Sequence, residues 1–461
     1  MTDRMTFHAF TAFGWSDGPR GVWHNEKLVP PRTQSDIDFW IDIARTAERG
    51  RFDTIFFADA VGMGGFMPED FEGEIRDGRM LLWDPAVVTP VLAKFTEHLG
   101  FVFTSSILQD HPFSFARKIS TIDQLSDGRV GWNIVTSYSP NAARNFGLDD
   151  LPSREDRYAW ADEYAKAAYS LWEGSWEDGS LLIDRRNGVF ADPAKVHPVD
   201  YVSPRYRIQG PHLTSPTPQR TPLLLQAGGS VPGRAFAARH AELQFISGSN
   251  DDKIVEDIAD VRRLAEQAGR RPKDLKFVLG ASFVIGGTEQ EARRKAEELA
   301  DAYDPAEVIA SINTATGVNL SADDLDTPLT GLVSGHASGG MSAVLDNLVE
   351  GLDPDNPPTL RELVRNRFTK YHTVGTPEQI ADRIGRWRDI GVGGLAVGMM
   401  PRPHGLTEFV DQVIPVLQER GLAQREYAPG TLRQKVMGYG DRLPHTHPAA
   451  EYRRGPVAGA D

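Results

Sequence analysis

The segment FVFTSSILQDHPFSFARKISTIDQLSDGRVGWNIV, residues 101–135, decides the fold. It begins with a β-rich apolar run, FVFTSSI, which predicts a buried strand over 101–107. Residues 113–125 then predict a helix, and Asp127-Gly128 predicts a turn into a second strand over 129–135. A strand, a helix and a strand in this order predict two parallel strands joined by a helical crossover.

The same alternation extends outward over nearly the whole chain. Eight β-rich runs alternate with stretches of helical periodicity, and eight βα units are the count of a (β/α)8 TIM barrel. A doubly wound sheet is the competing architecture, but it more often has five or six strands. The predicted fold class is therefore α/β, a TIM barrel, with these strands: Met5–Ala12, Asp53–Asp59, Phe101–Ile107, Arg129–Val135, Leu223–Gln226, Leu243–Ser247, Leu275–Ile285 and Leu395–Met399.

Capping signals indicate where three of the predicted helices begin. Asp84-Pro85 has the order expected of an N-cap followed by proline in the first turn, and Thr376-Pro377 repeats this order. Ser35 is placed to cap a helix that begins near Asp36. These starts agree with the alternation of strands and helices.

The chain is longer than a minimal barrel, and the extra residues fall in three places. Insertions are expected at the C-terminal mouth of the strands, at about 136–221 and about 303–375, where insertions in barrels shape active sites. Strands and insertions together form one domain over residues 1–435. The tail occupies residues 436–461, and from 438 onward we expect it to be loosely ordered.

Composition and charge exclude several kinds of chemistry. The 461 residues include 50 Lys and Arg against 64 Asp and Glu, a net charge of −14, which disfavours binding to nucleic acid. The absence of cysteine excludes disulfides, thiolate metal sites, iron–sulfur clusters and a cysteine nucleophile. The first residues, MTDRMTFHAF, lack the pattern of a signal peptide, and no apolar run approaches the roughly 18 residues that span a bilayer. We therefore expect a soluble cytoplasmic protein without a membrane partner.

The turn after the fifth predicted strand has the clearest chemical signal. In LLQAGGSVPGRAFAAR, residues 224–239, the strand ends in Ala-Gly-Gly-Ser and a helix follows through Pro-Gly. The amides of Gly229 and Ser230, with the Ser230 hydroxyl, could hold a phosphate at the N-terminus of that helix. The alternative is an ordinary β–α turn that needs glycines only for its geometry.

Polar side chains also stand late in other predicted strands. Asp59, Thr104 and Asn133 lie in strands two, three and four, where such residues point toward the catalytic mouth of a barrel. Each alone is more often a cap or a hydrogen-bonding loop residue. Arg154 and Tyr158 lie four apart in a predicted helix and share a face, so the arginine could clamp a phosphate. A surface arginine beside a half-buried tyrosine is the simpler interpretation of that pair.

Signatures of other enzyme classes are missing or fall in the wrong place. Gly391-x-Gly393-x-x-Ala396 resembles a dinucleotide fingerprint, but it precedes a predicted strand instead of following one. The sequence has no GxxxxGK[ST] loop and no GxSxG elbow. His445 and His447 have ligand-like spacing only in the tail, without a convergent set of carboxylates and histidines, so no metal site is predicted.

Together these residues resemble the bacterial-luciferase-like flavin monooxygenases, in the subgroup of nitrilotriacetate monooxygenase component A, dibenzothiophene-sulfone monooxygenase and long-chain alkane monooxygenase. The resemblance runs from about residue 5 to about residue 435. Its strongest stretches are specific in combination: RTAERGRFDTIFFAD (45–59), ARKISTIDQLSDGRVGWNIVTS (116–137), DRYAWADEY (156–164), GVFADPAKVH (188–197), LLQAGGSVPGRAFAARHAE (224–242) and GTPEQIADRI (375–384).

The resemblance implies that FMN binds at the C-terminal mouth of a TIM barrel. It places Asp59, Thr104 and Asn133 on the isoalloxazine side. Tyr158 and Ser230 then lie on the ribityl-phosphate side, where the QAG-x-S turn holds the phosphate. This placement agrees with the helix N-terminus argued from the residues alone.

The sequence departs from the family pattern at two expected cofactor-binding positions. The family often has histidine where this chain has Arg154, and often serine or another side chain where it has Gly229. Arg154 could still contact a phosphate or the substrate, because a fixed positive charge suits an anionic ligand.

The resemblance also implies the reaction and the partners. A separate NAD(P)H:flavin reductase would supply FMNH2, which would react with O2 to give a flavin C4a-peroxide that oxidises a small organic substrate. Such chemistry needs a dry, closed site more than an acid–base pair, so no catalytic acid or base is assigned. A homo-oligomer, either a dimer or a tetramer, is expected as well.

Alternative functions and the choice of substrate stay open at this point. A deazaflavin-dependent oxidoreductase on the same fold, a metal-dependent barrel hydrolase and a non-catalytic flavin-binding homologue are the alternatives. Phe13, Trp15, Trp23 and His24 could line an apolar pocket, and GVFADPAKVH looks most like the sulfone enzyme, which favours an aromatic or heterocyclic substrate. An alkane is another candidate. An aminopolycarboxylate would require several cationic side chains, of which Arg154 is the visible candidate.

Overall fold

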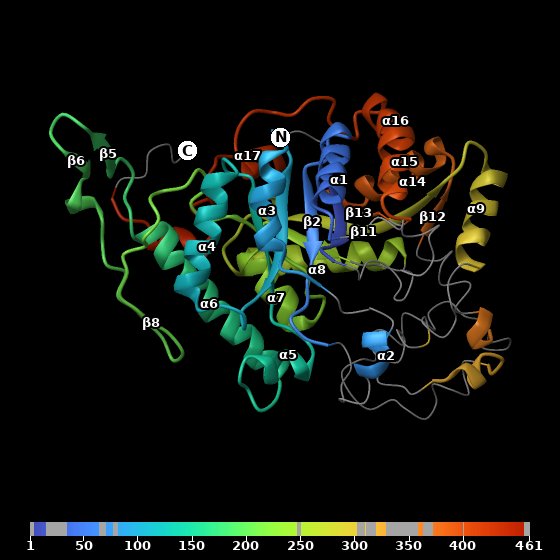
Figure 1. Ribbon diagram of the computed structural model, residues 1–461, viewed down its shortest axis with the longest axis horizontal. Helices are drawn as coiled ribbons and strands as arrows, with labels where there is room; N and C mark the ends of the chain where they lie inside the picture. The colour runs from blue at the N-terminus through green and yellow to red at the C-terminus, as the bar shows by residue number, and fades with distance from the viewer. Residues whose placement is uncertain are drawn as a thin grey trace.

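Eight parallel strands close into a barrel in this computed structural model (Figure 1). They follow one another around the barrel in chain order, and the last pairs with the first, which confirms the predicted TIM barrel. The strands are β1 (Thr6–Ala12), β2 (Thr54–Ala58), β3 (Gly100–Ser106), β4 (Val130–Val135), β9 (Leu223–Gln226), β10 (Leu243–Ile246), β11 (Lys276–Ile285) and β13 (Gly394–Gly398). The structure describes residues 4–14, 35–63, 71–76, 82–246, 250–301, 309, 320–328, 358–362, 372–399 and 401–455.

Helices cover the outside of the barrel (Figure 1): α1 (Ile37–Arg49), α3 (Pro85–Lys94), α4 (Pro112–Leu125), α6 (Arg154–Gly174), α7 (Val231–His240), α8 (Asp251–Gln267), α9 (Glu289–Asp301), α14 (Pro377–Asp389), α15 (His404–Glu408) and α16 (Ile414–Glu419). Asp84 caps α3, with Pro85 in the first turn, and Thr376 caps α14, as predicted. The prediction of Ser35 as the cap of α1 was wrong, because the N-cap is Asp36. None of the described helices is long and apolar enough to cross a membrane.

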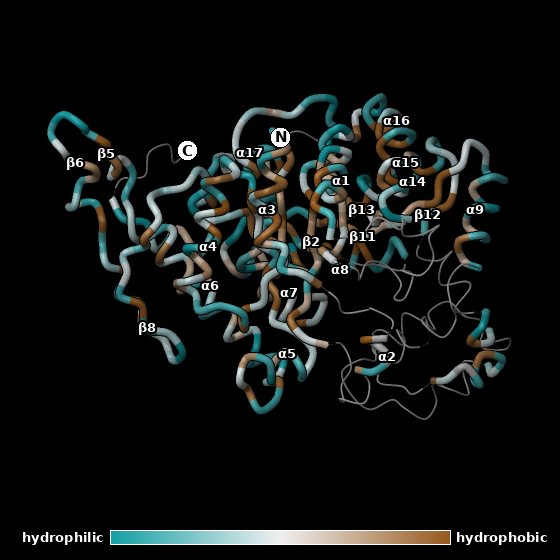
Figure 2. Tube along the Cα trace, viewed as in Figure 1, coloured by the Kyte–Doolittle hydropathy of each residue, from teal (hydrophilic) through white to brown (hydrophobic). Residues whose placement is uncertain are grey.

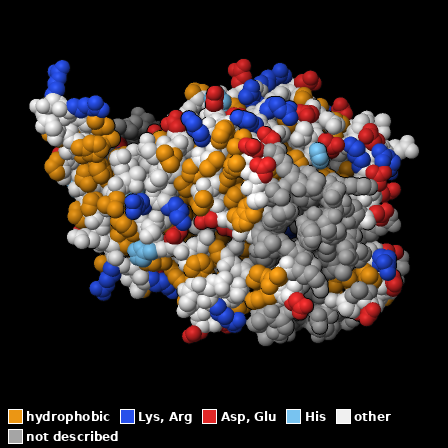
Figure 3. All heavy atoms as spheres, viewed as in Figure 1, with side chains coloured by type: hydrophobic (Ala, Val, Ile, Leu, Met, Phe, Trp, Pro, Cys, Tyr) orange, Lys and Arg blue, Asp and Glu red, His pale blue; other side chains and the backbone are white. Residues whose placement is uncertain are grey.

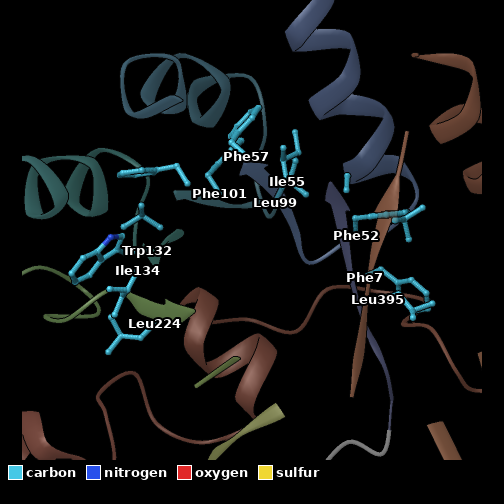
Figure 4. Packing of buried hydrophobic residues seen from close by; sticks show 14 of the residues in the cluster. Phe7, Phe52, Ile55, Phe57, Leu99, Phe101, Trp132, Ile134, Leu224 and Leu395 are labelled. Carbon is cyan, nitrogen blue, oxygen red and sulfur yellow. The ribbon is translucent and has the colours of Figure 1, made fainter. Parts of the chain in front are cut away.

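Side chains that alternate along the strands divide between two apolar layers. Phe56 and Val102 belong to the cluster inside the barrel. Phe57, Phe101 and Leu224 belong to the larger cluster between the strands and the helices (Figure 4). Strands buried on both faces have few polar positions, and Figure 2 shows the central strands as the most apolar part of the trace.

Short elements that the sequence did not reveal lie outside the barrel. The region 136–221, predicted as an insertion, contains α5 (Pro140–Asn145) and two hairpins, β5 (Leu181–Asp184) with β6 (Val189–Ala191) and β7 (Tyr201–Val202) with β8 (Arg207–Ile208). A ninth strand, β12 (His372–Gly375), pairs in parallel with the second half of β11. The β5–β6 hairpin stands away from the barrel at the left of Figure 1. Most of the other predicted insertion, 303–375, lies outside the described residues.

The C-terminal tail packs against the barrel as far as residue 455, so the expectation of loose order from residue 438 was wrong for these residues. Helix α17 (Leu432–Met437) places Leu432, Val436 and Met437 in the cluster inside the barrel. The Lys276 ammonium, at the start of β11, donates to the Val436 carbonyl. Helix α17, which leads into the tail, therefore closes the end of the barrel at which the strands begin.

Candidate active site

A cavity of about 280 Å³ lies at the C-terminal ends of the barrel strands. Because parallel strands end at the same edge, residues at or just after the ends of β2, β3, β4 and β9 all reach its wall. Three predicted residues, Asp59, Thr104 and Tyr158, line it directly. Gly228, from the predicted phosphate turn, lines it as well. The cavity thus brings the polar strand ends together with that turn.

Thr104 and Asn133 form a buried polar pair at the base of this cavity. They are register partners on β3 and β4, and Asn133 Nδ2 donates to Thr104 Oγ1 over 2.9 Å. Thr104 Oγ1 in turn donates to the Phe57 carbonyl over 2.9 Å. Asn133 Oδ1 is buried and has no hydrogen-bond partner among the described residues. Since a buried acceptor without a partner costs free energy, this oxygen suits an N–H group of a bound ligand.

Asp59 places an unusual carboxyl group in the cavity wall. It follows β2, and its Oδ1 accepts a hydrogen bond from the Ala60 amide over 2.8 Å. Burial raises the pKa of Asp59 to about 7; the Ala60 hydrogen bond opposes this rise and the charge of Asp84 adds to it. A carboxyl group that titrates near neutral pH can hold or release a proton beside a ligand.

This raised pKa predicts how stability depends on pH. Between about pH 4 and pH 7 the folded protein holds a proton on Asp59 that the unfolded chain has released, so the stability contributed by this group falls as pH rises. Above about pH 7 the fold carries a charged, poorly solvated carboxylate. Asp59→Asn should therefore raise the free energy of unfolding by roughly 2 kcal/mol more at pH 8 than at pH 5, measured by urea unfolding.

The exposed Asp149 provides the control for this measurement. Asp149→Asn should change the free energy of unfolding by the same small amount at both pH values. Equal effects of Asp59→Asn at pH 5 and pH 8 would contradict the burial of a neutral carboxyl group at residue 59.

Ser230 begins helix α7, as the sequence predicted. It is the N-cap, and its Oγ accepts from the Gly233 amide over 3.3 Å. The helix has ten residues, so its N-terminus presents the aligned amides and partial positive charge that favour an anion. A side chain added at Gly229 would meet no atom within 4 Å, so the space beside this turn is open.

Tyr158 approaches the same turn from helix α6. Its ring packs on Phe236 of α7, with ring centroids 5.7 Å apart. Its hydroxyl accepts a hydrogen bond from Gln226 Nε2 over 3.1 Å. Burial raises the pKa of Tyr158, although hydrogen bonds to Gln226 and Ser230 oppose the rise. The hydroxyl therefore stays protonated and can donate to an acceptor.

Arg154 lies at the edge of this site instead of inside it. It is the first residue of α6 and is exposed, and it is not among the residues that line the cavity. Its positive charge lies close enough to oppose, slightly, the rise that burial causes in the pKa of Tyr158. A guanidinium group at this position can contribute long-range attraction for an anion.

Two cavity residues, Gln226 and Gln109, were not named among the predicted site residues, although Gln226 is the first residue of the QAG-x-S turn. Gln226 is the last residue of β9, so the strand-end pattern that marked Asn133 would also have found it. Gln109 lies in the loop after β3, where its Oε1 accepts from the Ser106 amide, and no pattern in the sequence distinguishes it from other loop residues.

The predicted aromatic cluster is only partly within the described residues. Phe13 packs edge-on against Trp40 and Trp83, with ring centroids 4.9 and 5.3 Å apart, and lies partly buried against the apolar core. Trp15 and the remaining two members, Trp23 and His24, lie outside the described residues.

The donors and acceptors of the cavity fit flavin mononucleotide. The Asp59 carboxyl group and Thr104, which is hydrogen-bonded to the Asn133 carboxamide, line the cavity together with the Tyr158 hydroxyl and Gly228. Gly228 lies in the turn that leads to the N-terminus of α7. These groups match a ring with N–H and carbonyl groups that is joined to a phosphate. Within the described residues, no three His, Asp or Glu side chains converge in a way that could hold a metal ion.

Comparison with known proteins establishes the family. Residues 19–394 match the family model described as luciferase-like monooxygenase. The dimethyl-sulfide monooxygenase of Hyphomicrobium sulfonivorans is 36% identical over 98% of this chain and 94% of its own. The crystal structure of a long-chain alkane monooxygenase superposes with a TM-score of 0.86 at 32% identity, over 98% of this chain and 100% of that one. The crystal structure of a riboflavin lyase with a modified FMN and riboflavin superposes with a TM-score of 0.85 at 34% identity, over 98% of this chain and 100% of that one.

The chain therefore belongs to the luciferase-like monooxygenase family. It is a flavin-dependent monooxygenase of the subgroup that includes the long-chain alkane enzyme, as the sequence resemblance implied.

Proposed function

We propose that this protein is the oxygenase of a two-component system that uses FMNH2 and O2 to oxidise a small organic substrate. The observation that carries the proposal is the cavity at the strand ends. Thr104, the hydrogen-bond partner of the buried Asn133 carboxamide, lines it, and so does Gly228, in the turn that leads to the N-terminus of α7 at Ser230. FMNH2 supplies the electrons for oxygen activation when it is bound.

Each end of the cavity has a separate task in this proposal. Asn133 and Thr104 bind the polar edge of the ring, and Asp59 holds a proton beside it at neutral pH. Tyr158 and Ser230, with the amides after Gly228, hold the phosphate, and the exposed Arg154 attracts it. Gly229 contributes its backbone amide to the phosphate, and no protein atom lies within 4 Å of the place where its side chain would be.

The proposed partner is a separate NAD(P)H:flavin reductase that transfers FMNH2 by diffusion. The sequence supports this division of tasks, because the one stretch that resembles a dinucleotide fingerprint, Gly391 to Ala396, leads into β13 instead of following a strand. We also propose a cytoplasmic location, where the reductase can draw on NAD(P)H.

A neutral organic substrate is favoured over a polyanion. Of the described residues that line the cavity, none is lysine or arginine, and Asp59 adds an acidic group. An aminopolycarboxylate would leave its charges unpaired in such a site. The resemblance of residues 188–197 to the sulfone enzyme makes an aromatic or heterocyclic compound the first choice, with an alkane next.

We propose that the protein is a homo-oligomer. Val87, Val91 and Phe95 follow at intervals of four along α3 and its C-cap, and 72%, 39% and 44% of their surfaces are exposed. Figure 3 shows apolar side chains gathered over this part of the surface. An apolar stripe of this kind on a helix is typical of contact with a second copy.

Anaerobic titration tests the proposed function. The protein should bind FMNH2 at least tenfold more tightly than oxidised FMN, because its task is to accept the reduced cofactor. Rapid mixing of the reduced complex with oxygenated buffer should then slow the return of the oxidised flavin absorbance compared with free FMNH2. Equal affinity for the two redox states would contradict the reductase-partner model and favour a deazaflavin-dependent or non-catalytic homologue.

A further inference from the structure

The Tyr158 hydroxyl lies in a slot that two glycines leave open. A Cβ atom at Gly228 would lie 2.1 Å from the Tyr158 hydroxyl oxygen, and one at Gly233 would lie 2.8 Å from it. The hydroxyl therefore lies against the backbone of the turn and the first turn of α7. Such a close approach requires that both positions lack a side chain.

Gln226 holds this hydroxyl from the barrel side. It is 2% exposed, lines the cavity as the last residue of β9, and donates from Nε2 to the Tyr158 oxygen over 3.1 Å. Its Oε1 is buried without a hydrogen-bond partner among the described residues. The carboxamide nitrogen is thus engaged by the protein, and the carboxamide oxygen is left for a ligand.

The direction of these hydrogen bonds determines where the Tyr158 proton points. Because Gln226 Nε2 occupies one acceptor position of the phenolic oxygen, the Tyr158 proton is directed away from Gln226. On that side lies Ser230, whose Oγ already accepts from the Gly233 amide. The proton is thus available at the N-terminus of α7, where the phosphate is expected.

We propose that Gln226 is a positioning residue that joins two parts of the flavin site. Its Nε2 orients the Tyr158 hydroxyl toward the phosphate, and its Oε1 accepts a hydrogen bond from a hydroxyl group of the ribityl chain. This inference rests on the proposed function. It assigns to one side chain the recognition of both the phosphate and the polyol that precedes it.

Three flavins that lose these groups one after another test the assignment. FMN has the phosphate and the ribityl chain, riboflavin lacks the phosphate, and lumiflavin lacks both. Gln226→Met should weaken binding of the reduced forms by about 30-fold for FMN, about fivefold for riboflavin and less than twofold for lumiflavin. Tyr158→Phe should weaken the binding of reduced FMN about tenfold and leave the affinities for reduced riboflavin and lumiflavin within twofold of the wild type. Affinities are measured by anaerobic fluorescence titration.

A second variant, Gln226→Glu, should weaken the binding of FMN strongly and the binding of riboflavin only slightly. Gln226→Glu keeps an acceptor for the ribityl hydroxyl, but its carboxylate accepts a hydrogen bond from the Tyr158 hydroxyl, which turns this donor away from the phosphate, and its negative charge repels the phosphate. The affinity for reduced FMN should fall by more than 30-fold, whereas the affinity for reduced riboflavin should stay within threefold of the wild-type value. Gln418→Met is the matched control and should leave all three affinities unchanged, because it removes a glutamine of α16 that donates to the Gln424 carbonyl.

The outcomes separate this inference from the proposed function. Equal losses for all three flavins in Gln226→Met, or no loss for any, would overturn the role of Gln226. A wild-type protein that binds reduced FMN no more tightly than reduced lumiflavin would instead overturn the phosphate site itself. Thermal unfolding of each variant shows whether a lost affinity reflects a lost fold.

Discussion

Gly228→Ala is expected to weaken FMNH2 binding by about 100-fold and to leave the barrel folded. The new methyl group would lie 2.1 Å from the Tyr158 hydroxyl and 2.4 Å from Gln226 Nε2. Both atoms are ends of side chains, so they move aside instead of breaking the backbone. The phosphate then loses about two hydrogen bonds, worth about 3 kcal/mol, which corresponds to about 100-fold in the dissociation constant. Anaerobic titration measures this loss.

The neighbouring glycine provides the matched comparison. A Cβ atom at Gly229 would meet nothing within 4 Å, and alanine keeps the backbone amide. The loss of FMNH2 affinity in Gly229→Ala should therefore be at least tenfold smaller than the loss in Gly228→Ala. Similar losses in the two variants would show that the turn is sensitive to any side chain, which would contradict the specific contact with Tyr158.

Arg433→Met is expected to lower the free energy of unfolding by about 3–5 kcal/mol, because it leaves a buried carboxylate without its partner. Arg433 and Glu242 are both fully buried, and Arg433 Nε donates to Glu242 Oε1 over 2.7 Å. The same guanidinium donates to the carbonyls of Thr221 and Pro222. Urea unfolding of the purified protein measures the change.

Two further variants establish the cause of this loss. Arg420→Met breaks an exposed ion pair with Asp382 and should cost less than about 1 kcal/mol. Arg433→Met combined with Glu242→Met removes both buried charges and should recover part of the stability lost in the single variant. A double variant that is less stable than Arg433→Met alone would show that the hydrogen bonds to Glu242, not its charge, matter most.

The barrel could be predicted from sequence because its strands are buried on both faces. Such strands form continuous apolar runs, and all eight runs appear as strands in the barrel. Strand β12 and the two hairpins could not be predicted, because they have two to four residues each and, unlike the equally short β9 and β10, are mostly exposed or half-buried. Val189 and Phe190 of β6 are exposed, so no alternation of buried and exposed residues marks that strand.

The candidate site could be predicted in part, for a related reason. Asp59, Thr104 and Asn133 stand at strand ends, where a polar residue interrupts an apolar run, and Asp59 and Thr104 line the cavity while Asn133 supports Thr104. Gln226 has the same pattern, but it entered the prediction only as the first residue of the QAG-x-S turn. The position of Tyr158 depends on how α6 packs against α7, which no local pattern encodes.

The packing of α17, the helix that leads into the tail, could not be predicted because its charged residues are buried. Arg433 and Lys435 give the segment the composition of a surface. Their partners, Glu242 for Arg433 and the His98 carbonyl for Lys435, are distant in sequence. Hydropathy alone therefore predicts that this segment is exposed, whereas the structure buries it.

The closure of the barrel by α17 has a consequence for biosynthesis. Glu242 meets Arg433, a residue 191 positions later, and β13 ends at Gly398, so every strand leaves the ribosome before the helix that closes the barrel. Until Leu432 and Val436 have been translated, the nascent barrel exposes the apolar interior that they cover. The base of the barrel is therefore covered last, by a segment that is translated only after every strand.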